Sequence, residues 1–128
     1  MSLAIVYARV STEEQARQGY SLIDQLQECR DKAKQVGATD IMEFSDEGIG
    51  GDVLERPGLS RARELIRRGS VAHFICFDPD RLARKLSHQL LITDEIERSG
   101  CGLLFVNFNW QNTPEGRLFY SLLGAIAE

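Results

Sequence analysis

Four short apolar runs alternate along the chain with four segments that have helical periodicity, and this alternation limits the fold more than any other feature. The apolar runs are residues 3–10, 40–45, 71–77 and 101–107. The helical segments are residues 22–36, 57–68, 86–99 and 114–128. Short apolar runs bounded by turn residues are typical of buried strands. The order therefore predicts an α/β three-layer sandwich, with a mostly parallel sheet of about four to five strands and helices on both faces.

The expected helices begin and end at residues that suit those positions. Ser21 and Asp24 have the spacing of a capping box, and the helix behind them is expected to end near Gly37. Pro57 suits the first turn of the second helix. Thr113 is a good N-cap for the last helix, because its hydroxyl can accept a bond from a backbone N–H. These residues support the assignment of the helices.

The length of 128 residues is typical of one domain, and a hydrophobic content of 43% is enough to form a core. We therefore treat residues 1–128 as a single domain. The apolar runs are too short to cross a membrane, and no basic segment precedes the first of them, so neither a membrane span nor a signal peptide is expected. Three widely spaced cysteines without a CxxC pair predict reduced core thiols in a cytoplasmic protein, and no local metal motif is visible.

Charge is distributed unevenly along the chain. The formal net charge is −4, although residues 56–85 contain eight basic and only three acidic residues. An acidic protein with a basic centre fits local contact with phosphate, with general DNA affinity left to another segment. The alternative is a solvated helix face rich in arginine.

The last expected helix has little polar surface, because its apolar residues lie nearly all round it. We expect one side to cover the sheet and another to need a partner. The helix reaches residue 128 without a C-cap glycine or a basic last turn, so we expect a fragment that ends within a longer helix.

Chemically reactive side chains follow three of the expected strands. Ser11 follows the first strand, Asp46 the second and residues 80–84 (DRLAR) the third. Because the carboxyl ends of parallel strands lie at one edge of a sheet, these residues are expected to meet there. A serine can supply an attacking oxygen, and arginines bind phosphate oxygens with planar forks of donors. The combination predicts covalent phosphoryl transfer on a phosphodiester.

Each of these residues also has a purely structural interpretation. Ser11 can cap a helix, because Glu14 stands three residues further on. Asp80 and Arg81 can form a surface ion pair, which contributes only about 0–1 kcal/mol to stability. Arg56 can be a solvated residue before a helix.

Six short blocks, in order, resemble those of the serine site-specific recombinases, the resolvase/invertase family. They are residues 7–15 (YARVSTEEQ), 19–22 (GYSL), 46–49 (DEGI), 56–59 (RPGL), 80–84 (DRLAR) and 113–116 (TPEG). The second and fourth blocks are most similar to the large serine recombinases of phages and transposons. The resemblance covers nearly the whole chain and implies the N-terminal catalytic domain of such an enzyme, with a resolvase-like fold.

The resemblance implies a specific reaction. Ser11 would attack a DNA phosphodiester, become joined to the 5′-phosphate and release a 3′-hydroxyl, and the reverse attack would reseal the strand. Neither ATP nor a metal ion is expected. The implied partners are double-stranded DNA recombination sites and further copies of the protein, as a homodimer and a synaptic homotetramer. The implied location is the cytoplasm, at the nucleoid and not at a membrane.

The resemblance also implies which residues form the active site. Phosphate and the transition state would be bound by Arg9, Arg56, Arg81 and Arg84. Gln15 and Asp80 would complete the site, Asp80 by orienting an arginine or moving a proton. The chain departs from the family at Gly50, where many members have a serine.

Two alternatives stay open from the sequence. One is a doubly wound nucleotide-binding domain, although neither a GxGxxG fingerprint nor a P-loop is present. The other is a partner-binding or oligomerisation module of the same fold with impaired catalysis.

Overall fold

The computed structural model describes residues 2–11, 21–50, 53–109 and 113–127. Four strands form one sheet in the order β2-β1-β3-β4, and every neighbouring pair is parallel. The strands are β1 (Leu3–Val10), β2 (Asp40–Glu47), β3 (His73–Cys76) and β4 (Gly102–Phe105). The helices are α2 (Leu22–Gln35), α3 (Pro57–Arg67), α4 (Pro79–Leu82), α5 (Leu86–Arg98) and α6 (Pro114–Ala127). The predicted α/β fold is confirmed.

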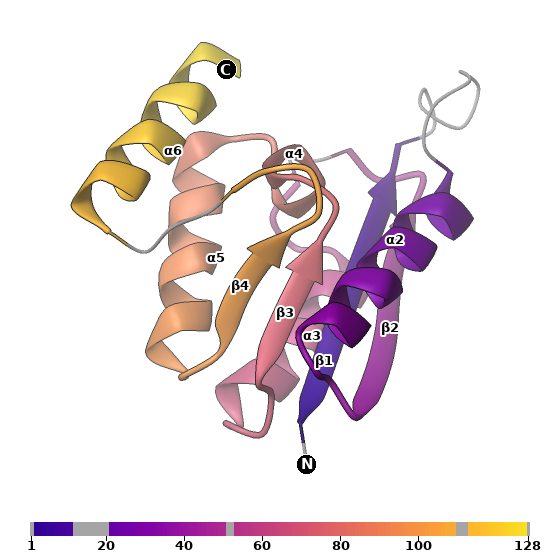
Figure 1. Ribbon diagram of the computed structural model, residues 1–128. Helices are drawn as coiled ribbons and strands as arrows, with labels where there is room; N and C mark the ends of the chain where they lie inside the picture. Colours follow the sequence, from indigo (N-terminus) through magenta and orange to yellow (C-terminus); the bar gives the residue numbers. More distant parts are fainter. Residues whose placement is uncertain (1, 12–20, 51–52, 110–112, 128) are drawn as a thin grey trace.

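Helices cover both faces of the sheet (Figure 1). On one face, Cys29 and Ala33 of α2 form a cluster with Ala4, Val6 and Ile75 of the sheet. On the other face, the core is larger and includes side chains from α3, α4 and α5. Because β1 is buried on both faces, its sequence is apolar at nearly every position.

The predicted helix starts are confirmed by hydrogen bonds. The Ser21 hydroxyl accepts a bond of 3.2 Å from the backbone N–H of Asp24. The Thr113 hydroxyl accepts one of 3.0 Å from the N–H of Gly116. Gly37 follows α2 with a φ of 84°, a left-handed conformation that favours glycine. Local sequence therefore determines where these helices begin and end.

The predicted core thiols are also confirmed. Cys29, Cys76 and Cys101 are buried and not in disulfides. Burial raises the pKa of Cys29 to about 12, so this thiol stays protonated at neutral pH.

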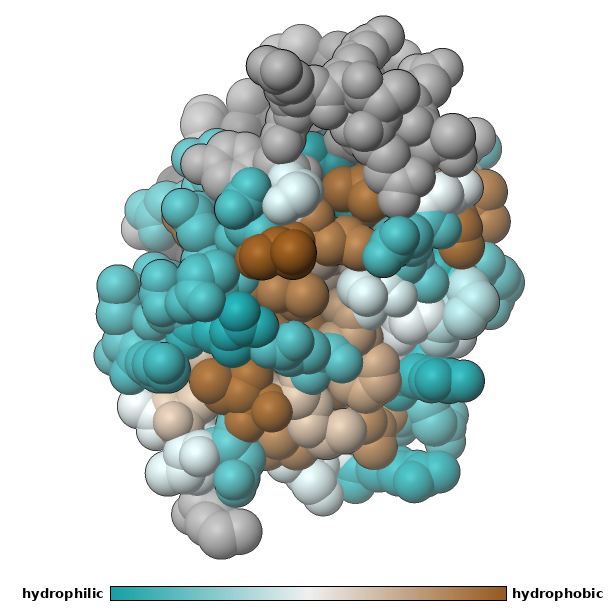
Figure 2. Space-filling view, turned by 90° about the vertical axis from the view of Figure 1, so that its right-hand side faces the viewer, coloured by the Kyte–Doolittle hydropathy of each residue, from teal (hydrophilic) through white to brown (hydrophobic). Residues whose placement is uncertain are grey.

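The edge strand β2 combines apolar and acidic exposed side chains. Figure 2, which views the molecule from the right-hand side of Figure 1, shows a band of hydrophobic side chains between hydrophilic ones. Met42 of β2 is exposed to 40%. Glu43 and Glu47 are also exposed on this strand, and their charges oppose pairing with the same strand of another copy.

The last helix, α6, lies differently from the expectation. It lies beside α5 at the side of the molecule (Figure 1) and meets the sheet at the edge strand β4, through Tyr120, instead of lying across a face. Tyr120 is buried and its ring packs against Phe105 and Phe108. Leu118 and Leu122 are exposed to 62% and 55%, which fits the expected need for a partner. The pattern predicted an apolar helix correctly but could not show which neighbour it packs on.

A short helix, α4, follows β3 and is absent from the sequence prediction. In the described part of the chain, no helix has the length and apolar character needed to span a membrane.

Candidate active site

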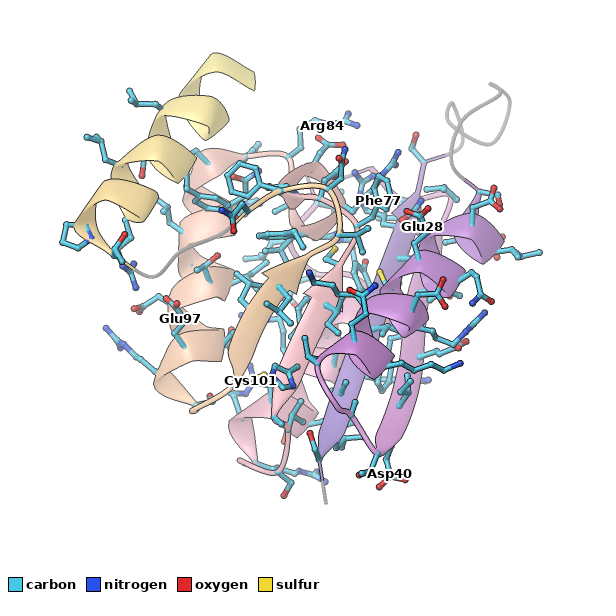
Figure 3. All side chains as sticks on the ribbon, in the orientation of Figure 1. Glu28, Asp40, Phe77, Arg84, Glu97 and Cys101 are labelled. Atoms are coloured by element: carbon cyan, nitrogen blue, oxygen red, sulfur yellow. The ribbon has the colours of Figure 1, made fainter. Side chains whose placement is uncertain are left out.

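The predicted site lies at the carboxyl edge of the sheet. Ser11 directly follows β1 and is partly exposed. Figure 3 shows Arg84 at this end of the sheet, whereas Asp40 and Cys101 lie at the opposite end. The parallel arrangement therefore brings the segment after β3 to the same edge as the serine, as the sequence predicted. Gln15 lies outside the described residues.

Arg9 connects three segments beneath this edge. Its side chain is fully buried. Its guanidinium donates a hydrogen bond of 3.2 Å to the carbonyl of Ile49 and one of 2.9 Å to the carbonyl of Asp80. A further contact of 3.4 Å reaches Oδ2 of Asp80. The strand that leads to Ser11 is thereby attached both to the segment after β2 and to the segment after β3.

Asp80 lies between two arginines. Its other carboxylate oxygen, Oδ1, is 3.4 Å from Nε of Arg84. The side chains of Asp80 and Arg84 are about half exposed, at 46% and 47%. Arg81 donates a bond of 3.2 Å to the carbonyl of Arg9. Hydrogen bonds and ion pairs therefore connect four of the predicted site residues, namely Arg9, Asp80, Arg81 and Arg84. The structural alternative, in which Asp80 forms only an isolated surface ion pair with Arg81, does not describe these contacts.

Asp78 holds the helix that carries two of these residues. Its carboxylate accepts a bond of 3.1 Å from the backbone N–H of Arg81, so it is the N-cap of α4. Burial raises the pKa of Asp78. An Asp followed by Pro is a recognisable helix start, and this is the sequence signal that the prediction missed.

Arg56 is the fifth predicted residue of the group, and it lies below the edge. It is fully buried, so the alternative of a solvated residue is wrong. Its guanidinium donates to the Tyr7 hydroxyl at 3.2 Å, to the carbonyl of Arg81 at 3.4 Å and to the carbonyl of Leu82. It also lies 5.7 Å from the centre of the Tyr7 ring, within the range of a cation–π contact. Through its bonds to the carbonyls of Arg81 and Leu82, Arg56 therefore stabilises α4.

Replacing Arg56 with methionine is expected to destabilise the fold by about 3 kcal/mol. The change leaves a hydroxyl and two carbonyls without the donor that they have now, and buried unsatisfied polar groups cost about 1–3 kcal/mol each. Urea denaturation measures the loss. The matched control is Arg61→Met, on the exposed side of α3, the helix that begins just after Arg56. Equal urea midpoints for the two variants would show that the buried guanidinium does not support the fold.

Asp46 caps α3 from a neighbouring strand. Its carboxylate accepts bonds from the backbone N–H groups of Gly58 at 2.8 Å and Leu59 at 3.0 Å. It also accepts a bond of 2.6 Å from the Tyr7 hydroxyl. Arg56, at the N-cap position, supplies no side-chain cap, so Asp46 takes that role. A Cβ on Gly58 would collide with the carbonyl oxygen of Ser45, which explains the glycine.

Tyr7 joins this cap to Arg56. Its hydroxyl donates to Asp46 and accepts from Arg56, so the two charged side chains are linked through it. Burial, outweighing the nearby Arg56 cation, raises the pKa of Tyr7 and keeps the hydroxyl protonated. The sequence prediction did not assign a role to Tyr7.

Gln25 is a further polar residue that the prediction missed. It is fully buried on α2, where its side chain bonds to the backbone of Arg9. A glutamine on the apolar stripe of an amphipathic helix is the signal that points to it. Among the described residues, His, Cys, Asp and Glu side chains do not form a cluster able to hold a metal ion.

The arrangement is suited to an anionic substrate. The hydroxyl of Ser11 stands at the end of a strand, two residues after a buried arginine, and two more arginines follow the neighbouring strand. Guanidinium groups can neutralise phosphate oxygens while a hydroxyl attacks phosphorus.

Comparison with known proteins places the chain in a family. Residues 4–128 match the model of the resolvase N-terminal domain. A protein of Bacillus subtilis named as a candidate DNA recombinase is 48% identical over 123 residues, covering 96% of this chain and 24% of that protein. The DNA-invertase of Escherichia phage P1 is 30% identical over 127 residues, covering 98% of this chain and 61% of the invertase. The chain thus spans only part of each relative.

A solved structure shows the same fold. The crystal structure of the N-terminal catalytic domain of TP901-1 integrase has a TM-score of 0.80 and 27% sequence identity. The match covers 98% of this chain and 93% of that domain. These matches do not favour a nucleotide-binding domain or a catalytically impaired module. The chain belongs to the resolvase family of serine recombinases, in the part of the sequence that forms their N-terminal domain.

Proposed function

We propose that this chain is the catalytic domain of a site-specific DNA recombinase that cleaves and rejoins DNA through a 5′-phosphoserine at Ser11. The observation that carries the proposal is the attachment of Arg9, two residues before Ser11, to the Asp80–Arg84 segment. A nucleophile and phosphate-binding cations from separate segments thereby lie at one edge of the sheet. The proposed domain comprises residues 1–128.

In the proposed reaction, the Ser11 hydroxyl oxygen attacks the phosphorus in line with the leaving oxygen. A P–O bond to serine forms, the P–O3′ bond breaks, the serine loses its proton and the 3′-oxygen gains one. The phosphoserine keeps the energy of the broken ester, so the reverse attack by a 3′-hydroxyl reseals DNA without ATP. The arginines neutralise charge on the non-bridging oxygens as it develops.

The arginines differ in how readily they can reach a phosphate. Arg84 is about half exposed at the edge, so it can bind DNA without a rearrangement. Arg9 and Arg56 are buried and donate to protein carbonyls. A rearrangement must expose each of them before one of its five N–H donors can reach an anion. Arg56 and Gln15 belong to the proposed site on motif position.

Replacing Asp80 with asparagine is expected to slow cleavage by about 100-fold, within the usual range for a lost acid–base or orienting group. Asparagine keeps the size of the side chain but has no charge to hold Arg9 and Arg84. DNA affinity should stay unchanged. The measurement is the rate of strand cleavage at saturating full-length protein. Asp94→Asn, an exposed ion-pair partner on α5, is the control. Equal cleavage rates for the two variants would refute this role.

We also propose that the protein acts on double-stranded recombination sites as a homodimer and a synaptic homotetramer, in the cytoplasm at the nucleoid. The exposed leucines of α5 and α6 support self-association. Leu90 and Leu91 are exposed to 39% and 50%, and Leu118 and Leu122 to 62% and 55%. Four large exposed apolar side chains on two neighbouring helices favour burial against another copy.

Replacing Leu118 with aspartate is expected to weaken dimer formation by at least about tenfold, because it puts a charge where an apolar side chain becomes buried. Sedimentation of the full-length protein measures the dissociation constant. Ile23→Asp is the control, because Ile23 on α2 is exposed to 77% and lies outside the proposed interface. A dimer affinity that is the same in both variants would count against this interface.

A further inference from the structure

The side chain of Gln25 forms hydrogen bonds to the backbone of β1 two residues before Ser11, as a neighbouring strand would. Gln25 is fully buried on α2. Its Nε2 donates a bond of 3.2 Å to the carbonyl of Arg9, and its Oε1 accepts a bond of 3.3 Å from the N–H of Arg9. Both backbone polar groups of one residue are thus satisfied by a single side-chain amide.

The pairing of β1 explains why this amide is needed. The ladder between β1 and β3 ends at the pair Tyr7 and Cys76, whereas the ladder between β1 and β2 continues to Val10. The Val10 carbonyl accepts from Gly48, just after β2, so the polar groups of Arg9 point the other way. The β1–β3 ladder ends before Arg9, and the Gln25 amide supplies the donor and acceptor of a peptide group at that position.

The Arg9 carbonyl is also shared with the arginine segment. Arg81 donates to it at 3.2 Å, in addition to the bond from Gln25. This carbonyl belongs to the peptide plane between Arg9 and Val10, and the next residue is Ser11. The orientation of that plane therefore helps to set where Ser11 stands relative to Arg81.

We propose that Gln25 is a positioning residue, which holds the Arg9 peptide so that Ser11 and Arg81 keep a fixed geometry for phosphoryl transfer. A leucine or methionine would fill the same apolar stripe without burying a polar group. A buried amide costs free energy unless it is hydrogen-bonded, so its presence here points to a partner that needs its donor and acceptor. Arg9 is that partner. The catalytic part of this inference rests on the proposed function.

The test uses three variants of the full-length protein. Gln25→Met removes both bonds while keeping the volume. Gln27→Met is the matched control, because Gln27 lies two residues away on the same helix and is exposed. Gln25→Glu keeps the acceptor, and it can donate to the Arg9 carbonyl only when the carboxyl is protonated.

The first measurement is hydrogen–deuterium exchange of the Arg9 amide, which does not depend on activity. Loss of one hydrogen bond should accelerate exchange by about tenfold in Gln25→Met, but not in Gln27→Met. Equal exchange in the two variants overturns the inference, whatever the protein does to DNA.

The second measurement is the rate of covalent adduct formation on supercoiled DNA that carries a recombination site. Gln25→Met should be about 100-fold slower than Gln27→Met at unchanged DNA affinity, because small displacements of reacting groups have effects of this size. Equal rates overturn the positioning role. If the parent protein forms no adduct at Ser11, the proposed function fails, and the exchange result still decides whether Gln25 holds Arg9.

The pH profile of Gln25→Glu separates positioning from general stability, and it decides the question if Gln25→Met does not fold. Burial raises the pKa of the new carboxyl, and the Arg81 guanidinium, which donates to the same Arg9 carbonyl, lowers it. Below the pKa that results, the side chain is neutral and can replace the amide. Its cleavage rate relative to the parent should recover as pH falls and be lost as pH rises. A constant ratio across pH contradicts the inference.

Discussion

Replacing Ser11 with alanine is expected to abolish the covalent DNA–protein intermediate, with a loss of at least about 1,000-fold in the cleavage rate. The change removes the attacking oxygen, and attack by water instead would release the phosphate without joining it to the protein. Ser11 is partly exposed after β1, so its removal should not unfold the domain or change DNA affinity. Denaturing electrophoresis of cleavage reactions detects the adduct.

The control for this variant is Ser87→Ala, an exposed serine near the start of α5. It should form the adduct at the rate of the parent protein. An adduct that still forms in Ser11→Ala would assign the nucleophile to another side chain and remove the basis of the proposed function.

Replacing Asp46 with alanine is expected to destabilise the domain by about 3–5 kcal/mol. The change leaves three donors without their acceptor: the N–H groups of Gly58 and Leu59 and the hydroxyl of Tyr7. It also removes a negative charge from the N-terminus of α3. Because most domains are stable by only 5–15 kcal/mol, this loss is a large fraction of the total stability. Thermal and urea denaturation measure the effect.

Asp40→Ala is the matched control, because Asp40 begins the same strand but is exposed. It should change stability by less than about 0.5 kcal/mol. If Asp46→Ala unfolds at the same urea concentration as this control, the carboxylate does not act as the cap of α3.

The sequence predicted the fold well because the fold depends on periodicity and local caps. The apolar run of β1 indicated a strand buried on both faces, and Ser21 and Thr113 marked real helix starts. The prediction failed where geometry depends on contacts between distant segments. The position of α6 beside α5 depends on how Tyr120 meets Phe105 and Phe108, which no local pattern encodes.

The sequence also predicted that Arg9 meets the segment after β3, but it placed Asp46 after the second strand, whereas Asp46 lies within β2 and caps α3. Parallel strands brought Arg9 to the segment of Asp80 and Arg81, as expected. The bonds of Arg56 to carbonyls of α4, and of Gln25 to the Arg9 backbone, join segments far apart in sequence. Such bonds depend on the direction of individual backbone groups, which appears only once the chain is folded.

The most direct test is to identify the residue that carries DNA. Full-length protein is trapped on supercoiled DNA containing a recombination site, digested with protease and nuclease, and analysed by mass spectrometry. Our account predicts a nucleotide joined through its 5′-phosphate to the peptide that contains Ser11. Attachment at any other residue, or through a 3′-phosphate, would contradict it.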